Sequence, residues 1–266
     1  MIDQCLKVEV MSINERIQAE LDRLEREKDI RILLAIESGS RAWGFPSPDS
    51  DYDVRFLYVH TTDWYLSVRE RRDVVEMPID DVLDISGWDI RKAFRLLLKS
   101  NGTLYEWLSS PLIYRVNDKA AAPIKTLAPK VLCVEAMFYH YYAMSKGKMH
   151  EISNADNAKL KTYLYALRTL LCCRWLLDDK EAPPMEFDTL KERYLPLGSE
   201  IRALVDKLLA EKAVSVEAEK RDRILMLDKY LQVELGRFEG VMGKYDLEPN
   251  YELADTAFRE TLGLLN

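Results

Sequence analysis

Two strand-like runs joined by a polar loop place the strongest restriction on how this chain can fold. Residues 30–36 read IRILLAI, which has the length and apolar character of a buried strand. Residues 51–59 read DYDVRFLYV, and their alternating aromatic and β-branched residues predict a second strand. The intervening SGSRAWGFPSPDS is rich in Gly, Ser, Pro and Asp, which favours turns. We therefore expect a sheet in the first half of the chain.

Further elements are expected around this pair of strands. Residues 12–28 are predicted to form a helix that begins with a capping box. Residues 74–85 are predicted to contain one or two strands, followed by a turn at Ser86-Gly87. The next helix is expected to start at Trp88, with Ser86 or Asp89 as its cap.

The character of the sequence changes in its second half. Asn101-Gly102 is expected to end the helix that starts at Trp88, and helical periodicity replaces the strand pattern after Pro111. Helices are expected near residues 129–146, 155–178, 199–212, 217–238 and 251–264. The pattern therefore predicts an α/β half of about 115 residues followed by a helical half.

Composition excludes some classes of protein. The 266 residues have a formal net charge of −7, which disfavours binding of nucleic acid by bulk charge but allows a local basic groove. No stretch approaches the ~20 apolar residues that span a bilayer, and no apolar run of signal-peptide length opens the chain. We expect a cytoplasmic protein without a membrane partner, whose four cysteines are reduced.

The loop and the strand after it contain the residues with the clearest chemical potential. Asp51 and Asp53 are two residues apart in a strand, so their carboxylates project from the same face. Two carboxylates this close repel each other unless a cation lies between them, and Mg²⁺ prefers such oxygen ligands. Gly39 lets the backbone approach a phosphate, and Ser40 offers a hydroxyl and an N–H. A phosphate cradle beside a carboxylate pair indicates metal-assisted phosphoryl or nucleotidyl transfer.

This arrangement resembles a known motif. Gly39-Ser40, ten residues, and then Asp51-Tyr52-Asp53-Val54 is similar to the pattern of polymerase β-type nucleotidyltransferases. The strings GSRAWGFPSPDSDYDVRF, GWDIRKAFRLLLKSNGTLYEWLSSPLIY and KLKTYLYALRTLLCCRWLL resemble one branch in particular, the predicted nucleotidyltransferases associated with RNA ligases and RNA repair. The resemblance covers about residues 31–196. Ser38 departs from the broad pattern, which often has a hydrophobic residue before the glycine, but a small residue fits a tight turn.

The resemblance implies an α+β fold and a division of labour between its parts. A small mixed-sheet nucleotidyltransferase core, the catalytic domain, is expected over residues 1–115. An all-helical, substrate-binding domain is expected over residues 116–266.

The resemblance also implies a third carboxylate on a neighbouring strand. Asp84 is the first choice because it lies late in the expected strand, and Asp80, Asp81 and Asp89 are the alternatives. Asp89 is also a natural helix cap. Two Mg²⁺ or Mn²⁺ ions per site are expected, with Asp51, Asp53 and the third acid as catalytic metal ligands.

Candidate nucleotide contacts come from both halves. Lys161, Tyr165, Arg168 and Cys172 fall on one face of an expected helix, with leucines on the opposite, core side. Lys161 and Arg168 are candidates for contact with a triphosphate, and Tyr165 for stacking on a base. The alternative is that both basic residues only form a solvated helix face or salt bridges. Arg41, beside Ser40, is a further candidate.

The function that this set of residues predicts is transfer of a nucleoside monophosphate from an NTP to a hydroxyl, with release of pyrophosphate. An RNA end is the acceptor that the resemblance favours. The same chemistry on a small molecule or a protein hydroxyl is the nearest alternative. A non-catalytic nucleotide-binding regulatory protein is another, which the presence of both Asp51 and Asp53 disfavours. The sequence assigns neither the NTP nor an oligomeric state.

Overall fold

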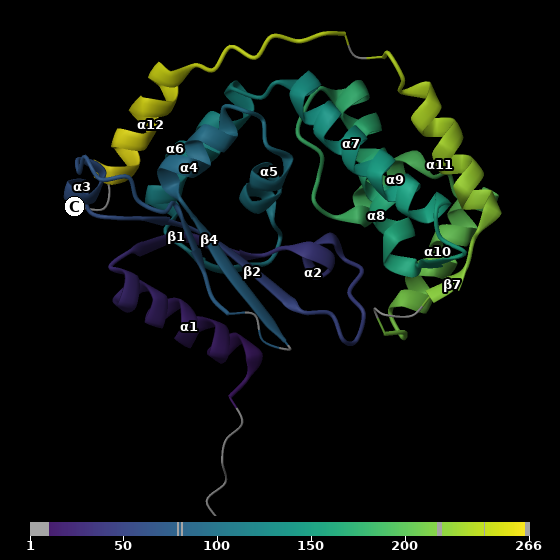
Figure 1. The fold of residues 1–266 in the computed structure, drawn as a ribbon, viewed down its shortest axis with the longest axis horizontal. Helices are drawn as coiled ribbons and strands as arrows, with labels where there is room; N and C mark the ends of the chain where they lie inside the picture. The colour runs from purple at the N-terminus through teal and green to yellow at the C-terminus, as the bar shows by residue number, and fades with distance from the viewer. Residues whose placement is uncertain (1–10, 79, 81, 217–219, 242, 264–266) are drawn as a thin grey trace, which may run out of the picture.

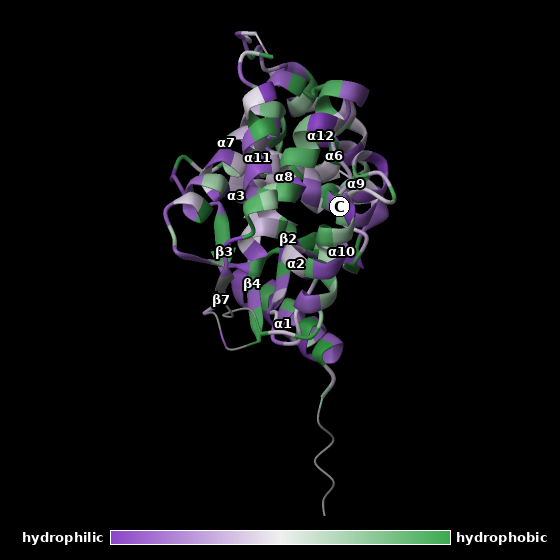
Figure 2. Cartoon of the chain, turned by 90° about the vertical axis from the view of Figure 1, so that its right-hand side faces the viewer, coloured by the Kyte–Doolittle hydropathy of each residue, from purple (hydrophilic) through white to green (hydrophobic). Residues whose placement is uncertain are grey.

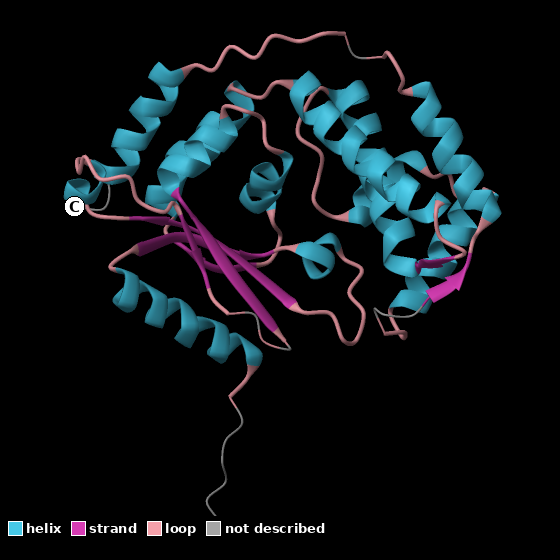
Figure 3. Ribbon diagram, viewed as in Figure 1, coloured by secondary structure: helices cyan, strands magenta, loops and turns pink. Residues whose placement is uncertain are grey.

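A mixed five-stranded sheet organises the first half of the molecule (Figures 1 and 3). The computed structural model describes residues 11–78, 80, 82–216, 220–241 and 243–263. The strand order is β3-β4-β2-β1-β5, in which β2 and β4 run parallel and the other neighbours are antiparallel. The strands are β1 (Arg31–Glu37), β2 (Tyr52–Val59), β3 (Val74–Glu76), β4 (Leu83–Asp89) and β5 (Ile113–Val116). The expected α+β class is confirmed.

Helices cover both faces of this sheet and make up most of the second half. The first six are α1 (Ile13–Lys28), α2 (Gly39–Trp43), α3 (Thr62–Tyr65), α4 (Ile90–Leu97), α5 (Gly102–Ser109) and α6 (Asp118–Leu127). The others are α7 (Val134–Ser153), α8 (Leu160–Asp179), α9 (Phe187–Tyr194), α10 (Glu200–Lys212), α11 (Leu225–Arg237) and α12 (Tyr251–Gly263). Two short strands, β6 (Asn157–Lys159) and β7 (Lys220–Asp222), pair beside the helices. No helix in the described ranges is long and apolar enough to cross a bilayer.

Apolar side chains from these elements form two clusters. One lies between α1 and the sheet and includes Ile17, Leu21 and Phe56. The other covers the opposite side of the sheet and continues through the helices. Figure 2 shows hydrophilic and hydrophobic residues mixed along most helices, the pattern of helices with one buried face.

The larger cluster includes residues from both sides of the expected domain boundary. That boundary, between residues 115 and 116, falls inside β5, which belongs to the sheet. In addition, α12 returns to pack against α4 and α6 (Figure 1). The division into two domains stays an interpretation.

The elements with local signals agree with the sequence. The α1 helix begins after Ser12, whose side chain and Glu15 form the predicted capping box. Both strands that flank the polar loop are present, as β1 and β2. The loop itself begins with the short helix α2, which the sequence did not predict.

The region after β3 differs from the prediction. The expected turn at Ser86-Gly87 lies inside β4, and the helix starts at Ile90 with Asp89 as its cap. The reason is packing, because a Cβ on Gly87 would lie 2.2 Å from the Phe56 ring. Glycine is therefore needed here for close contact within the sheet, not for a turn. Asn101, expected to end a helix, caps the start of α5 instead.

The second half is less uniform than predicted. The prediction missed α6 and α9, as well as the strands β5, β6 and β7, and it also missed α5 just before this half. The helix expected at 129–146 is α7, which begins at Val134 after a short 3₁₀ turn. The helix expected at 217–238 is α11, which begins only at Leu225. Residues 217–219 lie outside the described residues.

Candidate functional site

The acidic residues predicted to bind metal lie at one end of the β2–β4 pair. Parallel pairing places Asp53 directly opposite Asp84, the first choice for the third acid. Asp84 is the second residue of β4 and does not lie late in its strand, so that expectation was wrong. Asp51 is exposed just before β2, on the face that Asp53 shares by alternation. The structure therefore brings Asp53 and Asp84 together, and the position of Asp51 beside them stays a prediction from alternation.

An arginine that the sequence analysis did not consider joins the two opposed acids. Nη2 of Arg55 lies 2.9 Å from Oδ1 of Asp53 and 2.7 Å from Oδ2 of Asp84. Nη1 donates to the main-chain carbonyl of Asp84 at 2.9 Å. Alternation in β2 gave a signal, because Arg55 is two residues after Asp53 and must share its face.

Gly39 lies against the carboxylate of Asp53. Its φ is +60°, and a Cβ at this position would lie 2.2 Å from Oδ2 of Asp53. The main-chain N–H of Ser38 donates to the carbonyl of Asp53 at 2.8 Å, which fastens the two segments together. The glycine is therefore required both by the backbone conformation and by the space that the acid occupies.

The hydroxyl of Ser40 belongs to a chain of polar contacts. Ser40 Oγ donates to Ser50 Oγ at 3.2 Å, and Ser47 Oγ lies 2.9 Å from the same atom. Nζ of Lys212, at the end of α10, donates to Ser47 Oγ at 3.1 Å. Lys212 is buried and was missed by the sequence analysis, because a lysine in the last turn of a helix is ordinarily a dipole partner on the surface.

Glu37 is a second residue that the prediction missed. It is the last residue of β1, it is fully buried, and its Oε1 accepts from the main-chain N–H of Asp53 at 2.9 Å. Tyr114 donates to its other oxygen. Burial raises the pKa of Glu37, although the bonds from Tyr114 and Asp53 oppose that rise. A charged residue that ends an apolar strand was the available signal.

Arg41 fastens the loop between β1 and β2. Its Nη2 donates to the carbonyl of Ser50 at 2.7 Å, and its Nε donates to the carbonyl of Asp51 at 3.0 Å. Its guanidinium carbon lies 3.7 Å from the centre of the Tyr52 ring. The predicted nucleotide contact by Arg41 stays a prediction, and its observed bonds hold the main chain beside Asp51.

Arg168 does not lie on a solvated helix face but forms a salt bridge, the other form of the alternative to nucleotide contact. The helix α8 is buried on both of its sides, and Arg168 is only 2% exposed. Its Nη1 lies 2.8 Å from Oε1 of Glu106, and its Nε and Nη2 donate to the carbonyl of Met185. Its guanidinium also lies over the ring of Trp43.

This placement corrects the expected environment of the α8 residues. The physical reason is that α7, α9, α10 and α11 all pack around α8, so its polar side chains must find partners within the protein. Tyr165 packs edge-on against Trp43, and Lys161 is only partly exposed. Direct nucleotide contacts by Lys161 and Arg168 stay predictions.

The alternatives to Asp84 have other partners or lie outside the described residues. Asp80 is exposed and pairs with Arg16. Asp89 is buried, where it caps α4 and accepts from the Tyr65 hydroxyl at 2.7 Å. Asp81 lies outside the described residues. Asp84 is thus the one of the three described candidates that lies opposite Asp53.

The carboxylates fit a metal ion in their chemistry and in part in their placement. Three Asp side chains are a donor set that Mg²⁺ and Mn²⁺ accept. Asp53 and Asp84 both contact one nitrogen of Arg55, so a single cation is within bonding reach of both. Within the described residues, no group of three acids, His or Cys is arranged to hold an ion in this conformation.

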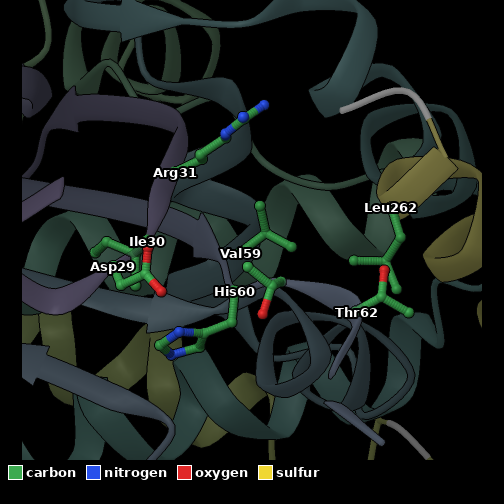
Figure 4. Close-up of a pocket in the computed structure, with 8 residues that line it drawn as sticks. Asp29, Ile30, Arg31, Val59, His60, Thr62 and Leu262 are labelled. Carbon is green, nitrogen blue, oxygen red and sulfur yellow. The ribbon is translucent and has the colours of Figure 1, made fainter. Parts of the chain in front are cut away.

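A cavity at the other end of the sheet is separate from these residues. It has a volume of about 230 Å³ and lies where β1 begins and β2 ends (Figure 4). Asp29, Arg31, His60 and Leu262 are among its lining residues. None of the predicted site residues lines it.

Comparisons with known proteins give the family. The family model described as "RNA repair pathway DNA polymerase beta family" (RlaP) matches residues 13–260. The uncharacterized protein YcgL of Bacillus subtilis (strain 168) is 41% identical over 225 residues, which cover 85% of this chain and 86% of YcgL. A crystal structure of a nucleotidyltransferase-like protein from Exiguobacterium sibiricum 255-15 aligns with 96% of this chain and 78% of that one. Its identity is 11% and its TM-score is 0.32, so this similarity does not bear on the family of the chain. The match over residues 13–260 shows that the chain belongs to the RNA repair pathway DNA polymerase beta family.

Proposed function

We propose that the protein is a divalent-metal-dependent nucleotidyltransferase that moves a nucleoside monophosphate from an NTP to a hydroxyl acceptor. Pyrophosphate is the second product, and an RNA end is the acceptor. The observation that supports this most directly is the opposition of Asp53 and Asp84 across β2 and β4, with Gly39 against Asp53. The family description supports the choice of RNA.

The proposed reaction forms and breaks one bond at the α-phosphorus of the NTP. The acceptor hydroxyl oxygen bonds to that phosphorus, the bond to the bridging oxygen of the β-phosphate breaks, and pyrophosphate leaves with the electron pair. The hydroxyl proton passes to a carboxylate, for which Asp84 is the candidate. Mg²⁺ or Mn²⁺, two ions per site, would be held by Asp51, Asp53 and Asp84 and would offset the negative charge on the phosphates.

The other site residues position these groups. Glu37 and the Ser38 N–H hold the main chain on both sides of Asp53. Arg41 holds the carbonyls of Ser50 and Asp51, which orients the start of β2. Rigid support of this kind matters because small displacements of metal ligands cost large factors in rate.

Contact with the nucleotide is proposed for Gly39, Ser40 and Arg41, whose segment lies beside the acids, and for Lys161 of α8. The Gly39-Ser40 main chain would approach the triphosphate, and Arg41 and Lys161 would offer positive charge to it. Arg168 is already bonded to Glu106 and Met185, so in this conformation it supports α8 and its neighbours. Charge from Lys161 and Arg41 would have to be local, because the chain as a whole is acidic.

The test is label transfer from each α-labelled NTP in the presence of Mg²⁺. Transfer should require RNA with a free 3′-hydroxyl, and an otherwise identical RNA with a 3′-phosphate should accept nothing because it lacks the nucleophile. D51N and D53N should each lower transfer by at least about 100-fold. D80N is the matched control, since Asp80 is exposed and pairs with Arg16 instead.

Each possible result has a definite meaning. Full activity of both D51N and D53N would show that the site is assigned to the wrong residues. Label on a protein or a small molecule, with none on RNA, would replace the acceptor but keep the chemistry. Nucleotide binding without any pyrophosphate release would instead indicate a regulatory protein.

A further inference from the structure

We propose that Arg55 occupies the position of a cation shared by Asp53 and Asp84, and that a divalent ion enters this position only by displacing the guanidinium. Arg55 would then set the ion concentration at which the site fills. The inference rests on the metal site of the proposed function and does not depend on which acceptor is used.

The contacts of Arg55 place its charge between the two acids. A single nitrogen, Nη2, bonds to Oδ1 of Asp53 at 2.9 Å and to Oδ2 of Asp84 at 2.7 Å. Nη1 donates to the carbonyls of Val54 at 3.2 Å and of Asp84 at 2.9 Å. The guanidinium therefore bridges two neighbouring strands in the way that a shared metal ion bridges its ligands.

The sheet geometry explains why a cation is needed there. Neighbouring strands lie about 4.8 Å apart, so carboxylates on paired positions such as Asp53 and Asp84 repel each other strongly. Glu37 lies next to Asp53, and Asp51, just before β2, is expected by alternation to add a further carboxylate on the same side. Without the guanidinium of Arg55, little positive charge would balance the negative charge of these acids.

The same geometry makes the guanidinium replaceable. The side chain of Arg55 is 16% exposed, and those of Asp53 and Asp84 are 31% and 26% exposed, so water and ions reach the pair. A divalent ion has twice the charge of the guanidinium and is smaller, so it can hold both carboxylates more closely. The two cations compete for the same oxygens.

The experiment measures binding of Mn²⁺ alone to the full chain, from the electron paramagnetic resonance signal of the free ion. R55Q should bind Mn²⁺ about 10-fold more tightly than the wild type, because one nearby charge changes the cation affinity of a carboxylate by at least that factor. R23Q removes an arginine that pairs with acids on α1, and its Kd should equal the wild-type value. A Kd of R55Q for Mn²⁺ that is equal to or higher than the wild-type value would overturn the proposal.

A second measurement uses thermal unfolding. R55Q should have a lower Tm than the wild type in metal-free buffer, since Asp53 and Asp84 then repel each other. Saturating Mg²⁺ should raise the Tm of R55Q by more than it raises that of the wild type. An equal rise in both proteins would count against displacement.

R55K provides the test if R55Q does not unfold cooperatively. A lysine ammonium lacks the planar fork of arginine and cannot repeat its four bonds, so it should be displaced more easily. The Kd for Mn²⁺ should fall by about 3-fold, less than in R55Q, because the charge remains. An unchanged or higher Kd would overturn the proposal.

Failure of this inference can be told apart from failure of the proposed function. Tighter Mn²⁺ binding by R55Q, in a protein that never releases pyrophosphate, would sustain the inference and reject the transferase. Nucleotidyl transfer by the wild type, with equal Kd values for Mn²⁺ in both proteins, would do the reverse.

Discussion

Two arginines of this molecule meet carboxylates in opposite surroundings. Arg55 lies at the open end of β2 and β4, where its partners Asp53 and Asp84 remain accessible to water. Arg168 lies inside the contact between α8 and α5, where Glu106 is almost as buried as the arginine. Both guanidinium groups also donate to main-chain carbonyls.

Solvent access distinguishes an ion pair that stabilises the fold from one that can take part in the site. A pair that is sealed from solvent cannot separate without leaving an uncompensated charge inside the protein, so it acts as a fixed part of the core. A pair that solvent reaches can exchange one partner for another cation at a small cost. Arg168 is thus a structural residue in this conformation, whereas Arg55 stands where an ion can replace it.

The largest expected effect concerns Arg168, the buried arginine of the two. R168M should lower the free energy of unfolding by ~3–5 kcal/mol, because it leaves the buried carboxylate of Glu106 without its positively charged partner. Urea denaturation at neutral pH measures this loss. The double variant R168M/E106Q should recover part of it, since no buried charge then remains. A loss below about 1 kcal/mol in the single variant would contradict the structural assignment.

A smaller effect is expected at Asp53, one of the solvent-accessible acids that Arg55 contacts. G39A should reduce nucleotidyl transfer by about 10-fold and weaken Mn²⁺ binding, because its methyl group would collide with Oδ2 of Asp53. G44A is the matched control. Gly44 also has a positive φ, of +90°, but a Cβ there would meet nothing within 4 Å. The control shares the backbone strain without the collision, so equal losses in the two variants would remove Asp53 from the explanation.

The smallest effect concerns Glu37, a buried acid beside the open ones. Its pKa in the folded protein is raised above the ordinary 4.5, chiefly by burial. The stability linked to this proton is therefore fully present below pH 4.5 and is lost as pH rises through the raised pKa. The glutamine of E37Q does not titrate. The free energy of unfolding of E37Q, relative to that of the wild type, should therefore increase as the pH rises above 4.5.

Urea denaturation of E37Q and the wild type across this pH range measures the difference. Y114F sharpens the test, because the Tyr114 hydroxyl donates a bond that holds the pKa of Glu37 down. In Y114F, the loss of stability should extend to higher pH than in the wild type. A stability difference between E37Q and the wild type that is independent of pH would show that Glu37 keeps its charge when buried.

How much the sequence could predict depends on how far apart the interacting residues lie along the chain. The capping box of α1 depends on residues three apart and was accessible from the sequence. The family resemblance correctly indicated the α+β fold. Asp84 came from the resemblance, and its position opposite Asp53 depends on the parallel register of β2 and β4.

The residues that the sequence did not reveal have partners far along the chain. Lys212 contacts Ser47 across 165 positions, and Arg168 contacts Glu106 across 62. Helical periodicity placed Arg168 on the same face as Lys161, but it could not show that other helices cover that face. Gly87 was mistaken for a turn residue because its packing partner, Phe56, lies on a different strand.

The return of α12 to α4 and α6 affects how the protein can fold during synthesis. The apolar residues Ala254 and Ala257 of α12 belong to the large cluster that also contains Phe94 of α4. The ribosome makes α4 about 150 residues before α12. That side of α4 and α6 stays uncovered until α12 has emerged, so the nascent chain depends on other protection against aggregation during this interval.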